Sequence, residues 1–226
     1  MNAASRRGLV VAIDGPAGAG KSTVAAHLAQ VFGLMNLETG AMYRALALKA
    51  LRTGTALDDG DAVLALTLGT SITLQPDTAG NCVLLDGVDV TTQLRAPEVT
   101  AAASQVSVHG PVRAWMVAAQ RDMGNAAECG VVMEGRDIGT VVFPDATVKL
   151  FLDASVEARG DRRYTQQPAK ESRDAVVKEM KERDTRDRSR AESPLRPATD
   201  ATLIDTTGLT LAQVLDRAEQ LVRAKL

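Results

Sequence analysis

Cysteine is scarce in this sequence, which contains only Cys82 and Cys129, far apart and in no C-x-x-C pair. This pattern excludes a disulfide scaffold, argues against a zinc site and fits a reducing compartment. The sequence also lacks an apolar run long enough to span a membrane, and the run after Arg7 is too short for the core of a signal peptide. We therefore expect a soluble, cytoplasmic protein with no membrane partner.

Neither sign of charge dominates the chain, which has 26 basic and 28 acidic side chains and a formal net charge of −2. A protein with this balance does not bind nucleic acid through its overall field, so we expect no such partner. Any anion site must be a local cluster of Arg and Lys. Histidine is scarce too: His27 falls inside a predicted helix and His109 in a Gly-Pro turn, which favours structural or exposed positions for both.

One motif carries most of the chemistry, because residues 13–23 read IDGPAGAGKST. The spacing G-x-x-x-x-G-K-[ST] is that of a P-loop, whose backbone N–H groups cradle phosphates at the start of a helix. Gly18 and Gly20 allow the backbone conformations that point these groups inward. Lys21 supplies charge for the β and γ phosphates of ATP, and the Ser22 hydroxyl is placed to bind Mg²⁺. The expected ATP-binding residues of the loop are Gly15, Pro16, Ala17, Gly18, Ala19, Gly20, Lys21, Ser22 and Thr23.

The flanking sequence supports the P-loop. Residues 9–14 form an apolar, β-branched run typical of a buried strand, and residues 21–32 carry apolar side chains at helical spacing up to Gly33. Strand, loop and helix in this order is the context that the motif requires. The alternative, a Gly-rich turn with a surface lysine, does not account for this context.

Five short apolar segments alternate with predicted helices, which indicates an α/β fold: a five-stranded parallel sheet flanked by helices on both sides. The segments are residues 9–14, the start of 34–51, 130–134, 147–153 and 201–206. In the second segment we expect a turn at Thr39-Gly40 before the helix. The last helix is predicted to begin at a capping box of Thr210 with Gln213. Its predicted apolar face is Leu211, Val214, Leu215, Ala218, Leu221 and Val222.

The middle of the chain has a different character. The short runs SITL, CVLLDG and VDVTTQ, with a turn signal at 77–81, predict a small inserted antiparallel sheet. Pro97 is expected to begin a helix that ends near Ser107, and Pro111 to occupy the first position of the next helix. We predict one P-loop kinase domain over 1–226. Its core covers about 9–67, 108–158 and 191–226, its nucleotide-monophosphate (NMP) binding insert about 68–107 and its lid about 159–190.

Two charged segments lie near the predicted phosphate site. EGRDIGT (134–140) follows a strand, and ligands of open parallel sheets bind beyond the carboxyl ends of the strands, so Arg136 and Asp137 are placed for a second substrate. A turn whose aspartate caps the backbone fits the spacing equally well. In the lid, RGDRR precedes the polar stretch 165–172, which is typical of a mobile lid between cationic helices. We expect Arg159 and Arg163 to contact ATP.

The segment KERDTRDRSR (181–190) places three arginines and one aspartate on a single helical face: Arg183, Arg186, Asp187 and Arg190. Alone, this pattern is typical of a solvated face with Arg–Asp pairs. Beside a P-loop it favours phosphoryl transfer, which needs several positive charges around the moving group. A kinase whose acceptor is a phosphate monoester needs no general base, because the second pKa of such a group is about 6.

Together, IDGPAGAGKST, ETGAMYRALAL, AASQV, EGRDIGTVVFPDA, KLFLDAS and KERDTRDRSRAESPL resemble the bacterial cytidylate (CMP/dCMP) kinase family, in the family's order and spacing and over essentially the whole chain from Leu9. The resemblance implies transfer of a phosphate from ATP to CMP or dCMP with Mg²⁺, in pyrimidine nucleotide metabolism. It also implies a parallel-sheet core, an NMP-binding region and a short lid. Nothing in the sequence demands more than a monomer.

The resemblance also implies roles for individual residues, carried over motif by motif. The implied clamp on the acceptor phosphate is Arg44, Arg136 and Arg190. The residues implied to read the cytosine edge are Ser104, Arg113 and Asp137. Arg183 and Asp187 are implied to hold the ribose, and Thr39 belongs to the same CMP site. The predicted catalytic residues are Lys21, Arg136 and Arg190, and the predicted metal ligand is Ser22.

Two residues depart from the family's pattern. Glu38 stands where Asp is usual, and Gly160 stands where Ala is usual in the helix before the lid, which it should loosen by about 1 kcal/mol. The carboxylate that orients Mg²⁺ is unassigned, because the position of Asp153 at the end of a strand suits either that role or a helix cap.

Two other functions are compatible with a P-loop. One is a small-molecule kinase for a different monophosphate or a shikimate-type acceptor, which predicts other residues in AASQV and EGRD. The other is a P-loop switch or regulatory ATPase with a protein partner. A switch requires a water-activating Gln or Asp and a switch segment, and we find no convincing candidate for either.

Overall fold

The computed structural model describes residues 8–77, 80–166 and 172–226. Its centre is a sheet of five parallel strands in the order β2-β6-β1-β7-β8. The strands are β1 (Val10–Asp14), β2 (Met35–Glu38), β6 (Val131–Gly135), β7 (Val148–Asp153) and β8 (Thr202–Asp205). The predicted α/β fold is therefore confirmed, and all five predicted strands are present.

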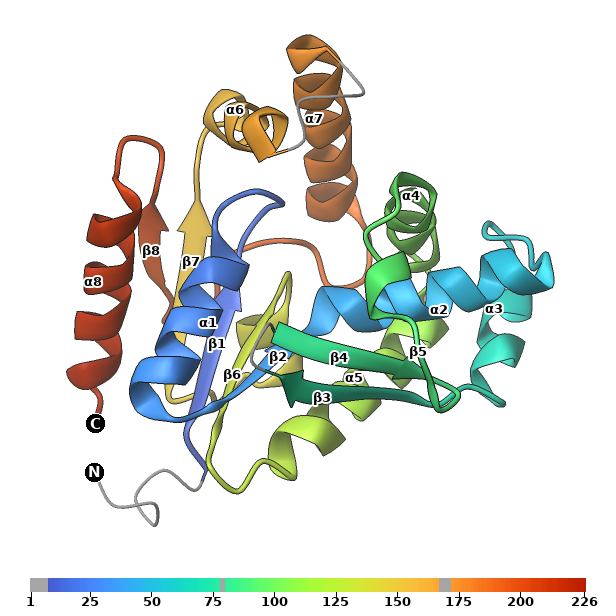
Figure 1. Ribbon diagram of the computed structural model, residues 1–226, viewed down its shortest axis with the longest axis horizontal. Coiled ribbons are helices and arrows are strands. Elements are labelled where there is room, and N and C mark those ends of the chain that lie inside the picture. The colour runs from blue at the N-terminus through green and yellow to red at the C-terminus, as the bar shows by residue number, and fades with distance from the viewer. Residues whose placement is uncertain (1–7, 78–79, 167–171) are drawn as a thin grey trace.

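Helices cover both faces of this sheet (Figure 1). On one face, α1 (Lys21–Phe32) and α8 (Leu211–Arg223) pack against Val11 and Ile13 of β1. On the other face, α2 (Thr39–Thr53) and α5 (Gly110–Asn125) pack with Ala12. Successive side chains of a strand point to opposite faces, so the short apolar run of β1 contributes to both cores. Full burial of a side chain such as Ile13 contributes about 1.5–3 kcal/mol.

The chain between α2 and α5 forms a smaller region beside the main sheet. It comprises α3 (Gly60–Thr67), β3 (Ile72–Asp77), β4 (Gly80–Leu85), β5 (Val88–Asp89), the 3-10 helix η2 (Thr91–Gln93) and α4 (Pro97–Val106). The three strands form the antiparallel sheet that the sequence predicts. A two-residue turn at Asp86 and Gly87, with φ of 52° and 82°, joins β4 to β5. Within the predicted turn at 77–81, residues 78 and 79 lie outside the described residues. The bounds of core, insert and lid stay predictions.

Several details differ from the sequence prediction. The helix α3 was missed, although Asp59 caps it by accepting hydrogen bonds from the N–H groups of Asp61 and Ala62. The segment VDVTTQ is a strand only at its first two residues, because Asp89 accepts two hydrogen bonds from Thr91 and turns the chain into η2.

The remaining differences are at helix starts. Thr39 and Gly40 begin α2 instead of forming a separate turn, and Pro111 is the second residue of α5, still within the turn that tolerates proline. Leu211 is 57% exposed, because it is the first residue of α8 and lies beyond the buried face. The predicted capping box of Thr210 and Gln213 is present.

Other sequence features have simple structural settings. His27 pairs with Glu219, and His109 donates a hydrogen bond to the carbonyl of Leu57. Both cysteines are free thiols. Across the described ranges, no helix combines the length and the apolar character needed to cross a membrane.

Two helices, α6 (Val156–Gln166) and α7 (Arg173–Ser189), stand beyond the carboxyl ends of the strands (Figure 1). Most of the predicted lid stretch 165–172 lies outside the described residues, namely 167–171. The two helices approach closely at Gly160, where an added Cβ would lie 2.4 Å from Cγ2 of Val177. Gly160 therefore has a packing role that the sequence pattern did not predict.

We expect Gly160→Ala to destabilise the protein although alanine is the better helix former. Overpacking at Val177 should cost about 1–3 kcal/mol, more than the gain of about 1 kcal/mol from helix propensity. Thermal unfolding followed by circular dichroism should show a lower Tm for Gly160→Ala and recovery when Val177→Ala is added. A higher Tm for Gly160→Ala alone would contradict the packing role.

Candidate active site

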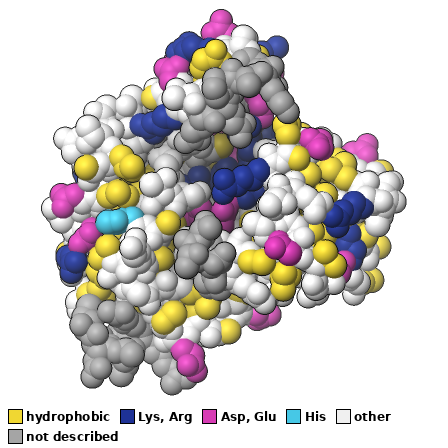
Figure 2. Space-filling model, viewed as in Figure 1, with side chains coloured by type: hydrophobic (Ala, Val, Ile, Leu, Met, Phe, Trp, Pro, Cys, Tyr) yellow, Lys and Arg dark blue, Asp and Glu magenta, His cyan; other side chains and the backbone are white. Residues whose placement is uncertain are grey.

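A cleft of about 750 Å³ opens at the carboxyl ends of the central strands, between the P-loop, α4 and α7. Figure 2 shows basic side chains gathered in this hollow, with acidic side chains beneath them. The basic residues that line it are Lys21, Arg44, Arg95, Arg113, Arg136, Arg162, Arg163, Arg183 and Arg190. The acidic residues that line it are Glu38, Glu134, Asp137 and Asp187. Its volume suits a small-molecule site, and its charge suits anions.

The P-loop joins β1 to α1 in a conformation that depends on glycine. Gly15 has φ of 144°, and a Cβ there would lie 2.0 Å from the carbonyl oxygen of Leu152. Gly20 has φ of 96° and precedes the first residue of α1, so the positive end of that helix faces the cleft. The loop therefore has the backbone geometry that phosphate binding requires.

Lys21 lies buried at the base of this loop and donates a hydrogen bond of 2.8 Å to the carbonyl of Pro16. Burial, together with the nearby charge of Arg136, lowers the pKa of Lys21 to about 7. The side chain thus lies among other cations, whose effect the carboxylates of Glu134 and Asp14 offset only in part. A bound polyphosphate would offset them further and stabilise the ammonium form.

Arg159 supports the P-loop from outside the cleft lining. It is buried, donates to the carbonyl of Ala17 at 3.0 Å and pairs with Asp184 of α7. Its predicted contact with ATP stays a prediction. Arg163 does line the cleft and lies 3.9 Å from Glu179.

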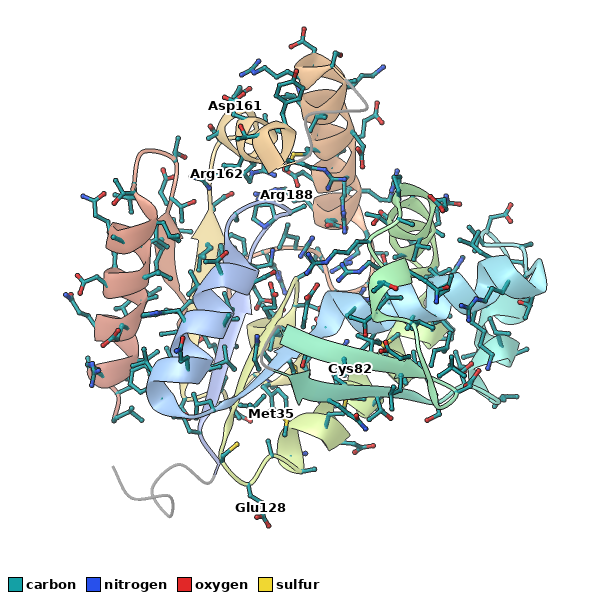
Figure 3. All side chains as sticks on the ribbon, viewed as in Figure 1. Met35, Cys82, Glu128, Asp161, Arg162 and Arg188 are labelled. Carbon is teal, nitrogen blue, oxygen red and sulfur yellow. The ribbon has the colours of Figure 1, made fainter. Side chains whose placement is uncertain are left out.

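Arg162 was not singled out from the sequence, yet it also lines the cleft. It comes from α6, as Figure 3 shows, and donates hydrogen bonds to the hydroxyl and the carbonyl of Thr206. Its position one turn after Arg159, within RGDRR, is the signal that could have identified it.

Asp14, the last residue of β1, connects the P-loop to the loop after β6. Its carboxylate accepts hydrogen bonds from the backbone N–H groups of Ile138 (2.8 Å) and Gly139 (2.7 Å), at the start of the short π-helix η3 (Ile138–Val142). Burial raises the pKa of Asp14 to about 6. The P-loop and the loop after β6 are therefore fixed relative to each other through one buried side chain, which the sequence pattern did not identify.

Across the cleft, ion pairs hold the predicted acceptor-side arginines. Arg136 donates to Asp187 of α7 at 3.0 Å, and Arg190 lies 3.9 Å from the same carboxylate. Burial acts to raise the pKa of Asp187, but Arg136, Arg183 and Arg190 hold it below its usual value. Arg44 pairs with Glu38 of β2, the residue that departs from the family's Asp.

Several of these arginines carry buried nitrogen atoms that have no hydrogen-bond partner among the described residues. The atoms are Nε of Arg44, Arg113 and Arg183, and Nη2 of Arg190. Burial, and then Arg136, lower the pKa of Arg183 to about 10. Buried donors in proteins are normally satisfied, so these atoms indicate where a ligand with hydrogen-bond acceptors belongs.

The predicted base-reading residues lie together at one end of the cleft. Arg113 of α5 and Asp137 form a buried ion pair, and the Arg113 guanidinium lies 5.5 Å from the centroid of the Tyr43 ring. Ser104 of α4 is 6% exposed and accepts a hydrogen bond from Arg186. Tyr43, whose pKa burial raises to about 12, was not identified from the sequence.

Thr39 is placed differently from these residues, although it too lines the cleft. Its hydroxyl donates to the carbonyl of Glu134 at 2.7 Å and so ties the end of β2 to β6. The hydroxyl proton of Thr39 is therefore engaged in a hydrogen bond within the protein.

Glu134 and Ser22 are the oxygen-bearing side chains that face each other beside the P-loop. Burial raises the pKa of Glu134, while Lys21 and a hydrogen bond with Ser22 act to lower it. Asp153 is not among the residues that line the cleft. Its carboxylate accepts a hydrogen bond from the N–H of Ala154 and pairs with Arg188.

This pair of residues fits a magnesium ion. Carboxylate and hydroxyl oxygens are the hard ligands that Mg²⁺ prefers, and Mg²⁺ usually takes one or two protein ligands together with substrate phosphates and water. Within the part of the chain that the structure describes, no group of three or more His, Cys, Asp and Glu residues could hold a metal alone. The residues present therefore suit a metal that enters with a phosphate substrate.

Comparison with known proteins gives consistent results. The family model described as Cytidylate kinase matches residues 11–224. A cytidylate kinase of Geobacter sulfurreducens is 47% identical over 228 residues, which cover 100% of this chain and 97% of that protein. A cytidylate kinase of Solibacter usitatus is 48% identical over 222 residues, which cover 96% of this chain and 93% of that protein. The crystal structure of an uncharacterized protein from Eubacterium ventriosum has a TM-score of 0.52 at 12% identity, covers 96% of this chain and 99% of that chain, and supports the fold alone.

The cleft geometry predicts that a bare polyphosphate binds at the P-loop. We expect tripolyphosphate to raise the Tm of the wild-type protein, since a ligand at about 100 times its Kd stabilises the folded state by about 2.7 kcal/mol. The substitution Lys21→Met should remove most of this shift, whereas Lys181→Met, at an exposed position of α7, should preserve it. An equal shift in all three proteins would place the anion outside the P-loop.

Proposed function

The chain belongs to the cytidylate kinase family, and we propose that its cleft transfers the γ-phosphate of ATP to CMP or dCMP, giving ADP and CDP or dCDP. The observation that carries this proposal is that the P-loop and a separate cluster of arginines line one cleft. A phosphate donor and a phosphate acceptor bound at these two places would meet between Lys21 and Arg136, whose charges interact.

On the donor side, we assign the triphosphate of ATP to the loop from Gly15 to Thr23 and to Arg163. Arg162 is added to this group because it lines the cleft on the same side. We infer that Ser22 and Glu134 would hold Mg²⁺, which when bound supplies positive charge to the β and γ phosphates. Lys21 leaves the Pro16 carbonyl and donates to the phosphates instead.

On the acceptor side, Arg44, Arg136 and Arg190 hold the phosphate of CMP. One oxygen of this phosphate forms a bond to the γ-phosphorus while the bond from that phosphorus to the β–γ bridging oxygen breaks, and ADP leaves with the electron pair. The acceptor phosphate is largely dianionic at neutral pH, so no general base is needed. Fixed guanidinium groups stabilise the charge of the moving group without reorganisation.

Substrate identity is read at the Ser104 end of the cleft. Asp137 is an acceptor only and suits the amino group of cytosine, whereas Arg113 is a donor only and suits the exocyclic carbonyl oxygen of the base. Arg183 and Asp187 hold the ribose, and Thr39 lines the acceptor site. A site with matched donors and acceptors rejects analogues strongly, because a wrong base leaves buried groups unpaired. A monomeric state and a cytoplasmic location stay predictions.

The function is tested by following ADP formation from ATP and Mg²⁺ with a panel of acceptors: CMP, dCMP, UMP, AMP, GMP, dTMP and shikimate. We expect CMP and dCMP to exceed the other acceptors by at least about 10²-fold in kcat/KM. Turnover with a different monophosphate would overturn the roles of Ser104, Arg113 and Asp137. ADP release that ignores every acceptor would contradict the kinase function.

A further inference from the structure

Ser104 has a contact that the proposed function does not use. Nη1 of Arg186, on α7, donates a hydrogen bond of 2.6 Å to the Ser104 hydroxyl, although the two residues are 82 positions apart in the sequence. Ser104 is buried and lines the cleft, whereas Arg186 is exposed. A solvent-facing arginine of α7 thus determines the surroundings of a hydroxyl inside the substrate cleft.

The chemistry of this contact is directional. A serine hydroxyl has one proton to donate and two lone pairs to accept with, and it normally rotates to suit its partner. A guanidinium has donors only, so the contact occupies a lone pair of Ser104 and leaves the hydroxyl proton available. A hydroxyl that accepts from a charged donor is polarised, which makes it a stronger donor and a weaker second acceptor.

The other hydrogen bonds near Ser104 involve backbone carbonyls and not its hydroxyl. Its backbone carbonyl accepts a hydrogen bond from Ser107, and the carbonyl of Ser107 accepts one from Arg113. Arg113 in turn pairs with Asp137. The Ser104 hydroxyl itself accepts its hydrogen bond from Arg186, whose guanidinium carries a full positive charge.

This direction distinguishes two pyrimidines that have nearly the same shape. At ring position N3, cytosine has a lone pair, whereas uracil has an N–H donor. A hydroxyl fixed as a donor pairs with cytosine N3 and faces the uracil N–H unfavourably. Resting on the proposed function, we propose that Arg186 is a positioning residue for base selection: it fixes the Ser104 hydroxyl as a donor and thereby favours cytosine over uracil.

The test compares kcat/KM for CMP and UMP in the full-length chain. Arg186→Met removes the charge but keeps an apolar stem, and it should lower the CMP-to-UMP ratio by about 10-fold, the scale of one hydrogen bond to a charged group. Arg186→Lys retains a charged donor and should preserve most of the ratio. The matched control is Arg188→Met. Arg188 lies on the same helix, is labelled in Figure 3 and pairs with Asp153. Its substitution should leave the ratio unchanged.

A double-mutant cycle separates this role from simple packing of α7 on α4. In a Ser104→Ala background, Arg186→Met should have no further effect on the ratio, because the hydroxyl through which it acts is absent. Equal losses for CMP and UMP in Arg186→Met, with an unchanged ratio, would overturn the inference while the kinase function stands. A wild-type enzyme that does not prefer CMP would instead overturn the proposed function on which the inference rests.

Discussion

The structure depends on how arginine side chains are held in and beside one partly buried cleft. A charge removed from water costs several kcal/mol unless it is paired, so each guanidinium requires either a carboxylate or a ligand. Arg159 pairs with Asp184, Arg136 with Asp187 and Arg113 with Asp137. The first two pairs join α6 and the loop after β6 to α7, so ion pairs in and beside the cleft hold this helix in place.

The pairing is incomplete in a way that indicates function. Buried nitrogen atoms of Arg44, Arg113, Arg183 and Arg190 lack partners within the described part of the chain, and the pKa of Lys21 is lowered by burial and by Arg136. In the proposed complex, the phosphates, base and ribose of the substrates would supply partners for these arginines, and the phosphates would favour the charged form of Lys21. Asp14 keeps the two groups of cations in a fixed relation, because it joins the start of the P-loop to the loop that follows β6.

Sequence reasoning predicted the parts of this arrangement that depend on local spacing. The P-loop, the five strands and the basic face of α7 follow from residues that are close in the chain. It missed the roles of Asp14 and Glu134 and the contact of Arg186 with Ser104, because the partners of these residues lie across the sheet or across the cleft. The close packing of Gly160 was missed for the same reason, since helix propensity carries no information about Val177. Local sequence signals did exist for the turn at Asp86-Gly87 and for the N-terminal cap of α3 at Asp59. The strand-like pattern of this part of the sequence obscured them.

The central claim is that one cleft holds both nucleotides at once, with their phosphates between the P-loop and the acceptor-side arginines. The most direct measurement is calorimetric binding of a bisubstrate analogue in which adenosine and cytidine are joined by a five-phosphate bridge. We expect each chain to bind one molecule of the analogue, more tightly than it binds ATP or CMP alone. At saturation the analogue should prevent both ATP and CMP from binding. An analogue that binds no more tightly than ATP, while CMP still binds to the saturated protein, would contradict a shared cleft.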